Sequence, residues 1–154
     1  MCKECGCDID PLKIYNNYLV EIERIMGKDT ETTNIELDAV GKKLFGKKYV
    51  GTFSSDRIPK LKKNQMCIAN LDDSTQPGSH WVALYCNDMN RTYFYDSFGR
   101  KVNSFKNIQK RNRHLIEAKD YDAEQKIEES NCGQRCMAIL SCFSTMPAKY
   151  VLQI

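Results

Sequence analysis

The 154-residue sequence lacks the features that mark an exported or membrane-embedded protein. No stretch approaches the roughly 18 to 20 consecutive apolar residues of a transmembrane helix. The opening MCKECGCDID contains neither an apolar core nor a signal-cleavage pattern. Internal repeats and low-complexity tracts are absent as well. We therefore expect an intracellular protein, nuclear or cytoplasmic, that has no membrane partner.

A large excess of charge of one sign is also missing. The 23 Lys and Arg residues nearly balance the 20 Asp and Glu residues, which leaves a net charge of +3. So small a charge does not make nucleic acid an obligatory partner. Hydrophobic residues make up 42% of the chain and charged residues 28%, which is typical of globular proteins. One compact domain is expected, since a chain of this length seldom holds two.

Cysteine, by contrast, is abundant. In a reducing compartment the eight cysteines are expected to be buried side chains, metal ligands or nucleophiles rather than cross-links. Cys2, Cys5 and Cys7 have a metal-like spacing, but a closed zinc site needs four ligands. A fourth ligand from elsewhere stays open as an alternative to a zinc-free terminus. The sequence itself requires no cofactor and predicts no metal site, and Cys136 and Cys142 are expected to be packing residues.

Two helices are predicted in the first third of the chain. Apolar residues recur at helical spacing through Asp10–Met26, where Asp10 is a suitable N-cap and Gly27 a stop. Thr33 and Glu36 then form a capping box that opens a shorter helix, and Gly46 ends it.

Strands follow, and then a last helix. Met66–Leu71 has the composition of a strand, and His80–Cys86 with Thr92–Asp96 reads as a hairpin. The last helix is predicted to begin near Asn131 and to end before Pro147. This order favours an α+β fold with a central mixed or antiparallel sheet.

The predicted hairpin brings an acid next to a histidine. If its turn centres near Asp88, then Val82 faces Phe94 and His80 faces Asp96. Opposite residues of an antiparallel pair have Cβ atoms roughly 4.5 to 5.5 Å apart, so a carboxylate can hold an imidazole N–H. Such a carboxylate fixes the tautomer of the histidine and stabilises the imidazolium. The hairpin therefore predicts the orienting half of a catalytic triad.

A nucleophile is predicted at the start of the last helix. Asn131 as N-cap, with Gln134 in a capping-box-like position, puts Cys132 in the first turn. A helix N-terminus and a nearby imidazolium both lower the pKa of a cysteine. Gly133 suits a close approach of substrate backbone. Gln125 could return its amide to the same place and form an oxyanion hole with a backbone N–H.

Three motifs stand in the order of one protease family. HWVALY begins at His80, YFYDSFG surrounds Asp96, and Gln125 precedes the NCG that contains Cys132. Together they resemble the adenovirus endopeptidase (adenain) family and, more distantly, the proteases of the same fold that remove SUMO and ubiquitin-like proteins. The resemblance extends over residues 34–146, since NIELDAVGKKLFGKKYVGTFSSDRIP is similar to the adenain amino-terminal helix and the segment after it.

The resemblance implies a role for each candidate residue. His80 would be the general base, Asp96 its orienting acid, Cys132 the nucleophile and Gln125 the oxyanion donor. Trp81 would pack beside the site. Adenain has Glu in place of this aspartate, whereas the deconjugating enzymes have Asp.

The resemblance also implies a fold and a biological setting. It predicts an adenain-like or papain-like cysteine protease domain at residues 34–154, preceded by a cysteine-containing segment and helix at residues 1–33. The enzyme would belong to a virus or virus-like element, cleave capsid and core precursors in the host nucleus or cytoplasm, and be packaged in the virion. A SUMO or ubiquitin-like deconjugase and an inert binding module of the same fold are the alternatives.

Simpler interpretations remain for each residue alone. His80 could be a structural histidine, Asp96 a turn residue and Cys132 a buried thiol. His114 is expected to be a solvated surface residue. A basic run could track a DNA backbone and make DNA an activator, as in adenain, or it could be a solvated face paired with the acidic stretch after it. The run consists of Arg100, Lys101, Lys106, Lys110, Arg111 and Arg113.

Overall fold

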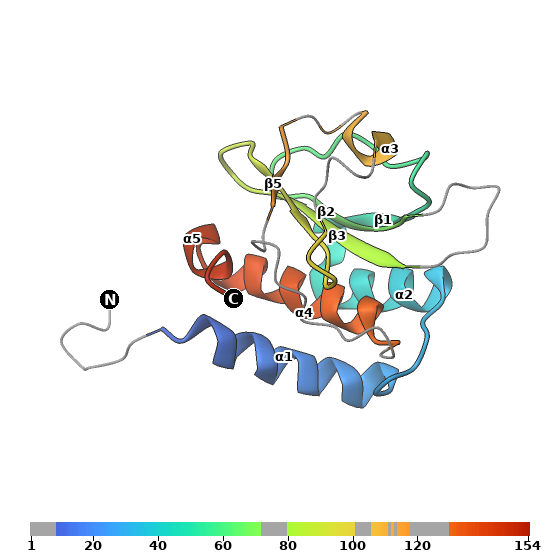
Figure 1. Ribbon diagram of the computed structural model, residues 1–154, viewed down its shortest axis with the longest axis vertical. Coiled ribbons are helices and arrows are strands. Elements are labelled where there is room, and N and C mark those ends of the chain that lie inside the picture. Colours follow the sequence, from blue (N-terminus) through green and yellow to red (C-terminus); the bar gives the residue numbers. More distant parts are fainter. Residues whose placement is uncertain (1–8, 72–79, 101–105, 111, 113, 118–129) are drawn as a thin grey trace.

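The computed structural model describes residues 9–71, 80–100, 106–110, 112, 114–117 and 130–154. These residues form an α+β fold in which helices pack against a five-stranded mixed sheet (Figure 1). In chain order the elements are α1 (Pro11–Met26), α2 (Asn34–Phe45), the 3-10 turn η1 (Gly46–Lys48), β1 (Tyr49–Phe53), β2 (Met66–Asn70), β3 (Trp81–Cys86), β4 (Thr92–Tyr95), α3 (Lys106–Gln109), β5 (Ile116–Glu117), α4 (Cys132–Thr145) and α5 (Ala148–Val151).

The strands lie in the sheet in sequence order, β1-β2-β3-β4-β5. The two outer pairs, β1 with β2 and β4 with β5, are parallel. The two central pairs, β2 with β3 and β3 with β4, are antiparallel. The sheet is therefore mixed, which is one of the two arrangements that the sequence predicts.

The helix boundaries follow the local signals in the sequence. The Asp10 carboxylate accepts from the Lys13 N–H at 3.2 Å, and Gly27 ends α1 at φ 95°. The Thr33 hydroxyl accepts from the Glu36 N–H at 3.2 Å at the start of α2. Both predicted helices and their caps are confirmed, because the bonds that cap them are formed within a few residues of chain.

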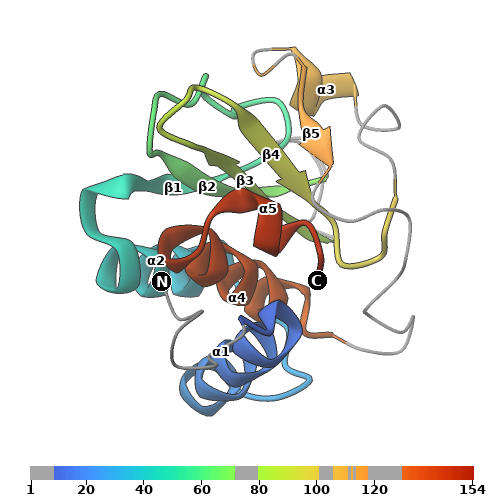
Figure 2. The ribbon, with the colours of Figure 1, turned by 90° about the vertical axis from the view of Figure 1, so that its left-hand side faces the viewer.

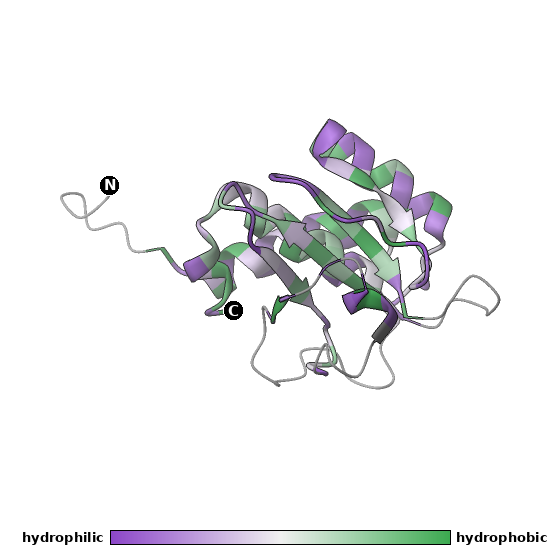
Figure 3. Cartoon of the chain, turned by 90° about the horizontal axis from the view of Figure 1, so that it is seen from above, coloured by the Kyte–Doolittle hydropathy of each residue, from purple (hydrophilic) through white to green (hydrophobic). Residues whose placement is uncertain are grey.

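The core is divided by the sheet. On one face, α1, α2 and α4 cover a large apolar cluster to which α4 contributes Met137, Ile139 and Leu140 (Figure 2). On the other face, a smaller cluster forms where Ile58 and Ile108 pack over β2 and β3. Hydrophobic colouring follows the central strands in Figure 3, and hydrophilic stretches lie mostly on the outer helices and connections. None of the helices in the described part of the chain has both the length and the apolar composition that a membrane crossing requires.

The predicted hairpin is present, but its register differs from the prediction. Leu84 pairs with Phe94 and Cys86 with Thr92, so the strands are shifted by two residues relative to a turn centred on Asp88. The reason lies in the turn. The Asn87 N–H donates to the Arg91 carbonyl at 2.9 Å, and the connection in between contains a left-handed residue, which moves its centre towards the carboxyl end.

Candidate active site

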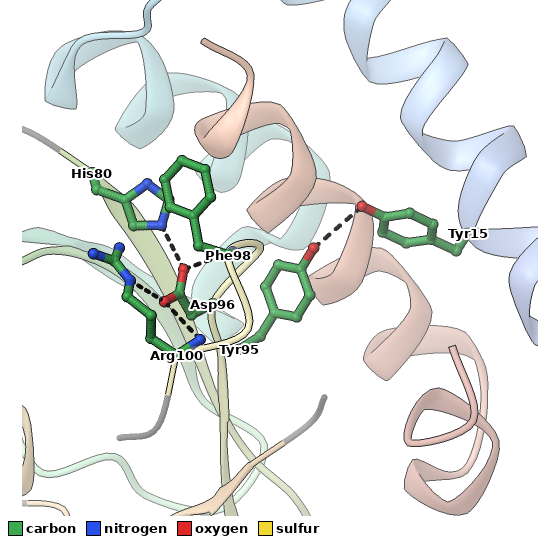
Figure 4. A network of polar contacts seen from close by, with 6 residues as sticks. All are labelled: Tyr15, His80, Tyr95, Asp96, Phe98 and Arg100. Carbon is green, nitrogen blue, oxygen red and sulfur yellow. Dashed lines mark hydrogen bonds and ion pairs between the residues drawn. The ribbon is translucent and has the colours of Figure 1, made fainter. Parts of the chain in front are cut away.

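His80 and Asp96 are in direct contact at the ends of two neighbouring strands. His80 immediately precedes β3, and Asp96 immediately follows β4. The imidazole Nε2 lies 2.6 Å from Asp96 Oδ1, and both side chains are buried (Figure 4). The expected pair forms despite the two-residue shift in register, because side chains two residues apart on a strand point to the same face. A shift of one residue would have separated them.

The Asp96 carboxylate is held by four hydrogen bonds. Oδ1 accepts from His80 and from the Phe98 N–H at 3.0 Å, while Oδ2 accepts from Arg100, through Nε at 2.9 Å and through the backbone N–H at 3.3 Å. Burial alone would raise the pKa of Asp96. The hydrogen bond and charge of His80, together with the bonds from Arg100 and Phe98, outweigh burial and lower that pKa. Asp96 is therefore a stable anion with a fixed orientation.

Phe98 contacts the imidazole ring of His80, and Arg100 contacts Phe98. The Phe98 ring stacks on the His80 imidazole, with ring centroids 4.5 Å apart and planes inclined by 26°. The Arg100 guanidinium lies 5.1 Å from the centroid of the same phenyl ring, within the range of a cation–π contact. Figure 4 shows the three side chains gathered around Asp96. The ring of His80 is thus fixed both by a hydrogen bond and by stacking.

Cys132 is the first residue of α4. It lies close enough to His80 for each of the two side chains to shift the pKa of the other. Since Nε2 of His80 faces Asp96, Nδ1 is the nitrogen that remains for the Cys132 sulfur. The histidine therefore bridges a thiol and a carboxylate that stand far apart in the sequence.

The pKa values of the bridged groups move in the directions that favour an ion pair. Burial opposes the charge on both. For Cys132, the hydrogen bond and charge of His80, then the backbone N–H groups of Trp81 and Gly133, outweigh burial and lower the pKa of the thiol. For His80, the hydrogen bonds to Asp96 and Cys132 outweigh burial and raise the pKa of the imidazole. Thiolate and imidazolium stabilise each other, as a nucleophilic cysteine requires.

Cys132 also differs from the other described cysteines in exposure. It is half-buried, whereas Cys67, Cys86, Cys136 and Cys142 are buried. Burial raises the pKa of Cys67 to about 12. A reagent from solution can therefore meet one partly exposed sulfur of lowered pKa among these five thiols.

The start of α4 is not capped as the sequence predicts. The Asn131 Oδ1 accepts from Arg135 Nε at 3.1 Å. The Gln134 amide donates to the carbonyls of Gly27 and Thr30, at 2.9 Å each, instead of returning to the helix start. The capping-box prediction is wrong because two carbonyls far away in the sequence, those of Gly27 and Thr30, take the glutamine side chain.

Several predicted site residues lie outside the described part of the chain. Gln125 is one of them, and so are Cys2, Cys5 and Cys7 at the amino terminus. In the basic run, Lys101, Arg111, Arg113 and the side chain of Lys106 are likewise outside it. Lys110 is exposed, whereas Arg100 belongs to the Asp96 cluster. His114 is exposed, as predicted.

The sequence alone did not identify Phe98, Arg100 or Gln134 as neighbours of the site. Phe98 and Arg100 carried a usable signal, because both follow Asp96 so closely that a turn folds them back onto it. Gln134 carried no such signal, since its partners lie more than a hundred residues earlier.

Comparison of the sequence with protein-family models and with curated proteins finds no match. Within the described residues, no group of three or more His, Cys, Asp and Glu side chains is gathered as a metal site would need.

Proposed function

We propose that the chain is a cysteine endopeptidase with an adenain-like fold and a Cys132–His80–Asp96 triad. The observation that carries this proposal is the position of His80, which is bonded to Asp96 and lies close enough to the half-buried Cys132 to lower the pKa of its thiol. Triads are recognised by geometry and by the role of each group rather than by sequence position.

The geometry supports acylation followed by deacylation. His80 accepts the proton of Cys132, and the thiolate attacks the scissile carbonyl carbon to give a tetrahedral oxyanion. Backbone N–H and, by the resemblance, the amide of Gln125 stabilise that oxyanion. The imidazolium then protonates the leaving amine, and the tetrahedral intermediate collapses to a thioester. Water, deprotonated by His80, hydrolyses the thioester and restores the free thiol.

The substrate class comes from the resemblance described above. An adenain-like enzyme of a virus or virus-like element would cleave capsid and core precursors during assembly. The aspartate in the acid position is shared with SUMO and ubiquitin-like deconjugases, so these tagged proteins form the second substrate class. Both classes use the same chemistry at the same three residues.

Selective alkylation tests the site without knowledge of the substrate. Iodoacetamide near neutral pH should modify Cys132 far faster than the other seven cysteines, as read by mass spectrometry of each thiol. The advantage should vanish in His80→Ala. Uniform reactivity in the wild type would contradict the proposal and favour an inert binding module.

Cleavage assays then separate the substrate classes. A peptide library is compared with SUMO and ubiquitin fusions, using the wild type, Cys132→Ala and the control Cys136→Ala. Cys136 lies one turn further along α4 and is buried, so its variant should keep activity. Cleavage of peptides but not fusions supports an endopeptidase, and the reverse supports a deconjugase. No cleavage of either would argue against a peptidase.

DNA is proposed as an activator through the basic run. Arg100 is engaged with Asp96, so the contact would fall to the rest of the run, of which Lys110 is exposed. Duplex DNA should raise the cleavage rate at low salt and lose its effect as salt rises. A rate unchanged by DNA at low salt would rule out this role.

A further inference from the structure

The amino-terminal part of the chain touches the strand that carries the histidine. We use the name N-terminal brace for α1 and the connection from Gly27 to Thr33. The indole Nε1 of Trp81, the residue after His80, donates to the Thr32 carbonyl at 3.1 Å. This bond fixes the beginning of β3 against the brace, one residue from the proposed general base.

The same connection holds the beginning of α4. Gln134, which is fully buried, donates to the Gly27 and Thr30 carbonyls at 2.9 Å each. Gly133 lies so close to the connection that an added Cβ would come within 2.2 Å of Thr32 Oγ1. Two residues that directly follow Cys132 are therefore fixed against the segment that also holds Trp81.

A third contact comes from the middle of α1. The hydroxyl of Tyr15 lies 3.3 Å from that of Tyr95, the residue before Asp96 (Figure 4). Arg135 Nη1 donates to the same Tyr15 hydroxyl at 3.5 Å, and Arg135 Nε donates to Asn131. One tyrosine thus connects the end of β4 with the turn that presents the nucleophile.

We propose that the N-terminal brace sets the geometry of the triad, with Gln134, Trp81 and Tyr15 as positioning residues. Each triad residue has a sequence neighbour bonded to the brace: Trp81 beside His80, Tyr95 beside Asp96, and Gln134 close behind Cys132. This inference rests on the proposed cysteine-protease function. It goes further, because it assigns a role in catalysis to a helix that lies outside the catalytic motifs.

The chain offers a matched pair of variants to separate positioning from simple helix packing. Tyr15 and Tyr18 both project from α1, and both hydroxyls make hydrogen bonds. Tyr18 donates to Thr145 at 3.1 Å, at the far end of α4 from Cys132. Each Tyr→Phe change removes one hydroxyl and leaves the ring in place.

Tyr15→Phe should lower kcat about three- to tenfold and leave KM unchanged, because a small displacement of the reacting groups slows the chemical step more than binding. The alkylation of Cys132 should need a higher pH, since a loosened contact with His80 stabilises the thiolate less. Tyr18→Phe should match the wild type in kcat and in the pH dependence of alkylation.

Gln134→Met is a second test with a larger expected effect, because it removes two hydrogen bonds to the N-terminal brace. Its kcat should fall roughly ten- to a hundredfold. Trp81 is the single tryptophan of the chain, so its fluorescence reports directly on the brace and should shift to longer wavelength in this variant. A circular dichroism spectrum and melting curve establish that each variant is folded before its rate is compared.

The outcomes separate the two proposals. If Cys132 of the wild type has no reactive advantage, the protease proposal fails. If the wild type shows that advantage while Tyr15→Phe and Gln134→Met, both folded, keep the alkylation profile of Tyr18→Phe, the brace merely stabilises the fold and this inference is wrong.

Discussion

The two halves of the site are held in place by different means. The proposed base and acid, His80 and Asp96, stand at the ends of adjacent strands whose register is fixed by backbone hydrogen bonds. The proposed nucleophile, Cys132, lies on a helix much later in the chain, and packing and side-chain bonds fix the start of that helix. A strand pair aligns its side chains by construction, whereas a helix end can slide or rotate when one contact is lost. The histidine half should therefore tolerate distant changes better than the cysteine half.

The largest effect is expected from the removal of His80, because this residue interacts both with Asp96 and with Cys132 of the other half. His80→Ala should lower kcat/KM about a thousandfold, within the range of a lost general base. The chain has one other histidine, which gives a control: His114 is exposed at φ 58°, so His114→Asn suits its left-handed backbone. This control should retain full activity in the same peptide assay. Equal losses in both variants would contradict the assigned role of His80.

The next largest effect is expected at the cysteine half, from Gly133→Ala. The added methyl group would lie 2.2 Å from Thr32 Oγ1 and 3.0 Å from Leu37 Cδ2. Overpacking costs about 1–3 kcal/mol, and the better helix propensity of alanine returns up to about 1 kcal/mol. Chemical denaturation should show a net loss of stability of about 1 kcal/mol, together with reduced kcat.

A double variant identifies the clash as the cause. Thr32→Ala removes the nearest atom, so Gly133→Ala should cost less stability in that background than in the wild type. Equal costs in both backgrounds would mean that Thr32 is not the obstacle.

At the histidine half, a change in the turn between β3 and β4 should lower stability, as Gly133→Ala does, but should not affect catalysis. Asn90 lies in the turn at φ 61°, a conformation that alanine adopts at a cost of about 1 kcal/mol. Asn90→Ala should therefore lower the free energy of unfolding by about that amount and leave kcat unchanged, because the strand register survives. If folded Asn90→Ala lost as much kcat as Gly133→Ala, the histidine half would not tolerate distant changes better than the cysteine half.

The same contrast explains what the sequence could predict. Caps such as Asp10 and Thr33 act on residues a few positions away, so the helices could be recognised from the local pattern. The triad candidates could be found because their residue types and order are informative. The strands β1 and β5 were missed, since each pairs in parallel with a partner that local patterns do not reveal, and β5 has only two residues.

The differences at the site have more than one origin. The hairpin register depended on the position of one left-handed residue in the turn, which composition does not specify. Gln134 was assigned to a local cap, although its partners are carbonyls at the end of α1 and beyond. The sequence analysis placed Arg100 in a basic run, and the bond from its guanidinium to Asp96 was not predicted. Bonds between residues far apart in the sequence decide only the case of Gln134, whereas the turn and the bond of Arg100 to Asp96 are local.

The smallest expected effect concerns the charge on Arg100. Removing this cation in Arg100→Gln leaves the negative charge of Asp96 less compensated, so the imidazolium of His80 is stabilised and the pKa of His80 rises further. Activity requires the imidazolium to protonate the leaving amine, and it is lost as pH rises through that pKa. The alkaline limb of kcat/KM should therefore move upward by about half a pH unit, a modest shift because the Arg100 side chain is 43% exposed and solvent screens its charge.

Arg100→Lys keeps the charge and should leave the alkaline limb near its wild-type position, which separates the electrostatic effect from the lost hydrogen bond. Titration of the His80 ring by NMR gives the same pKa independently of any substrate. Movement of the limb to lower pH in Arg100→Gln would mean that Arg100 acts mainly by holding the Asp96 carboxylate against His80. In that case the histidine half, like the cysteine half, depends on side-chain bonds, and the two halves would differ only in the backbone pairing of β3 with β4.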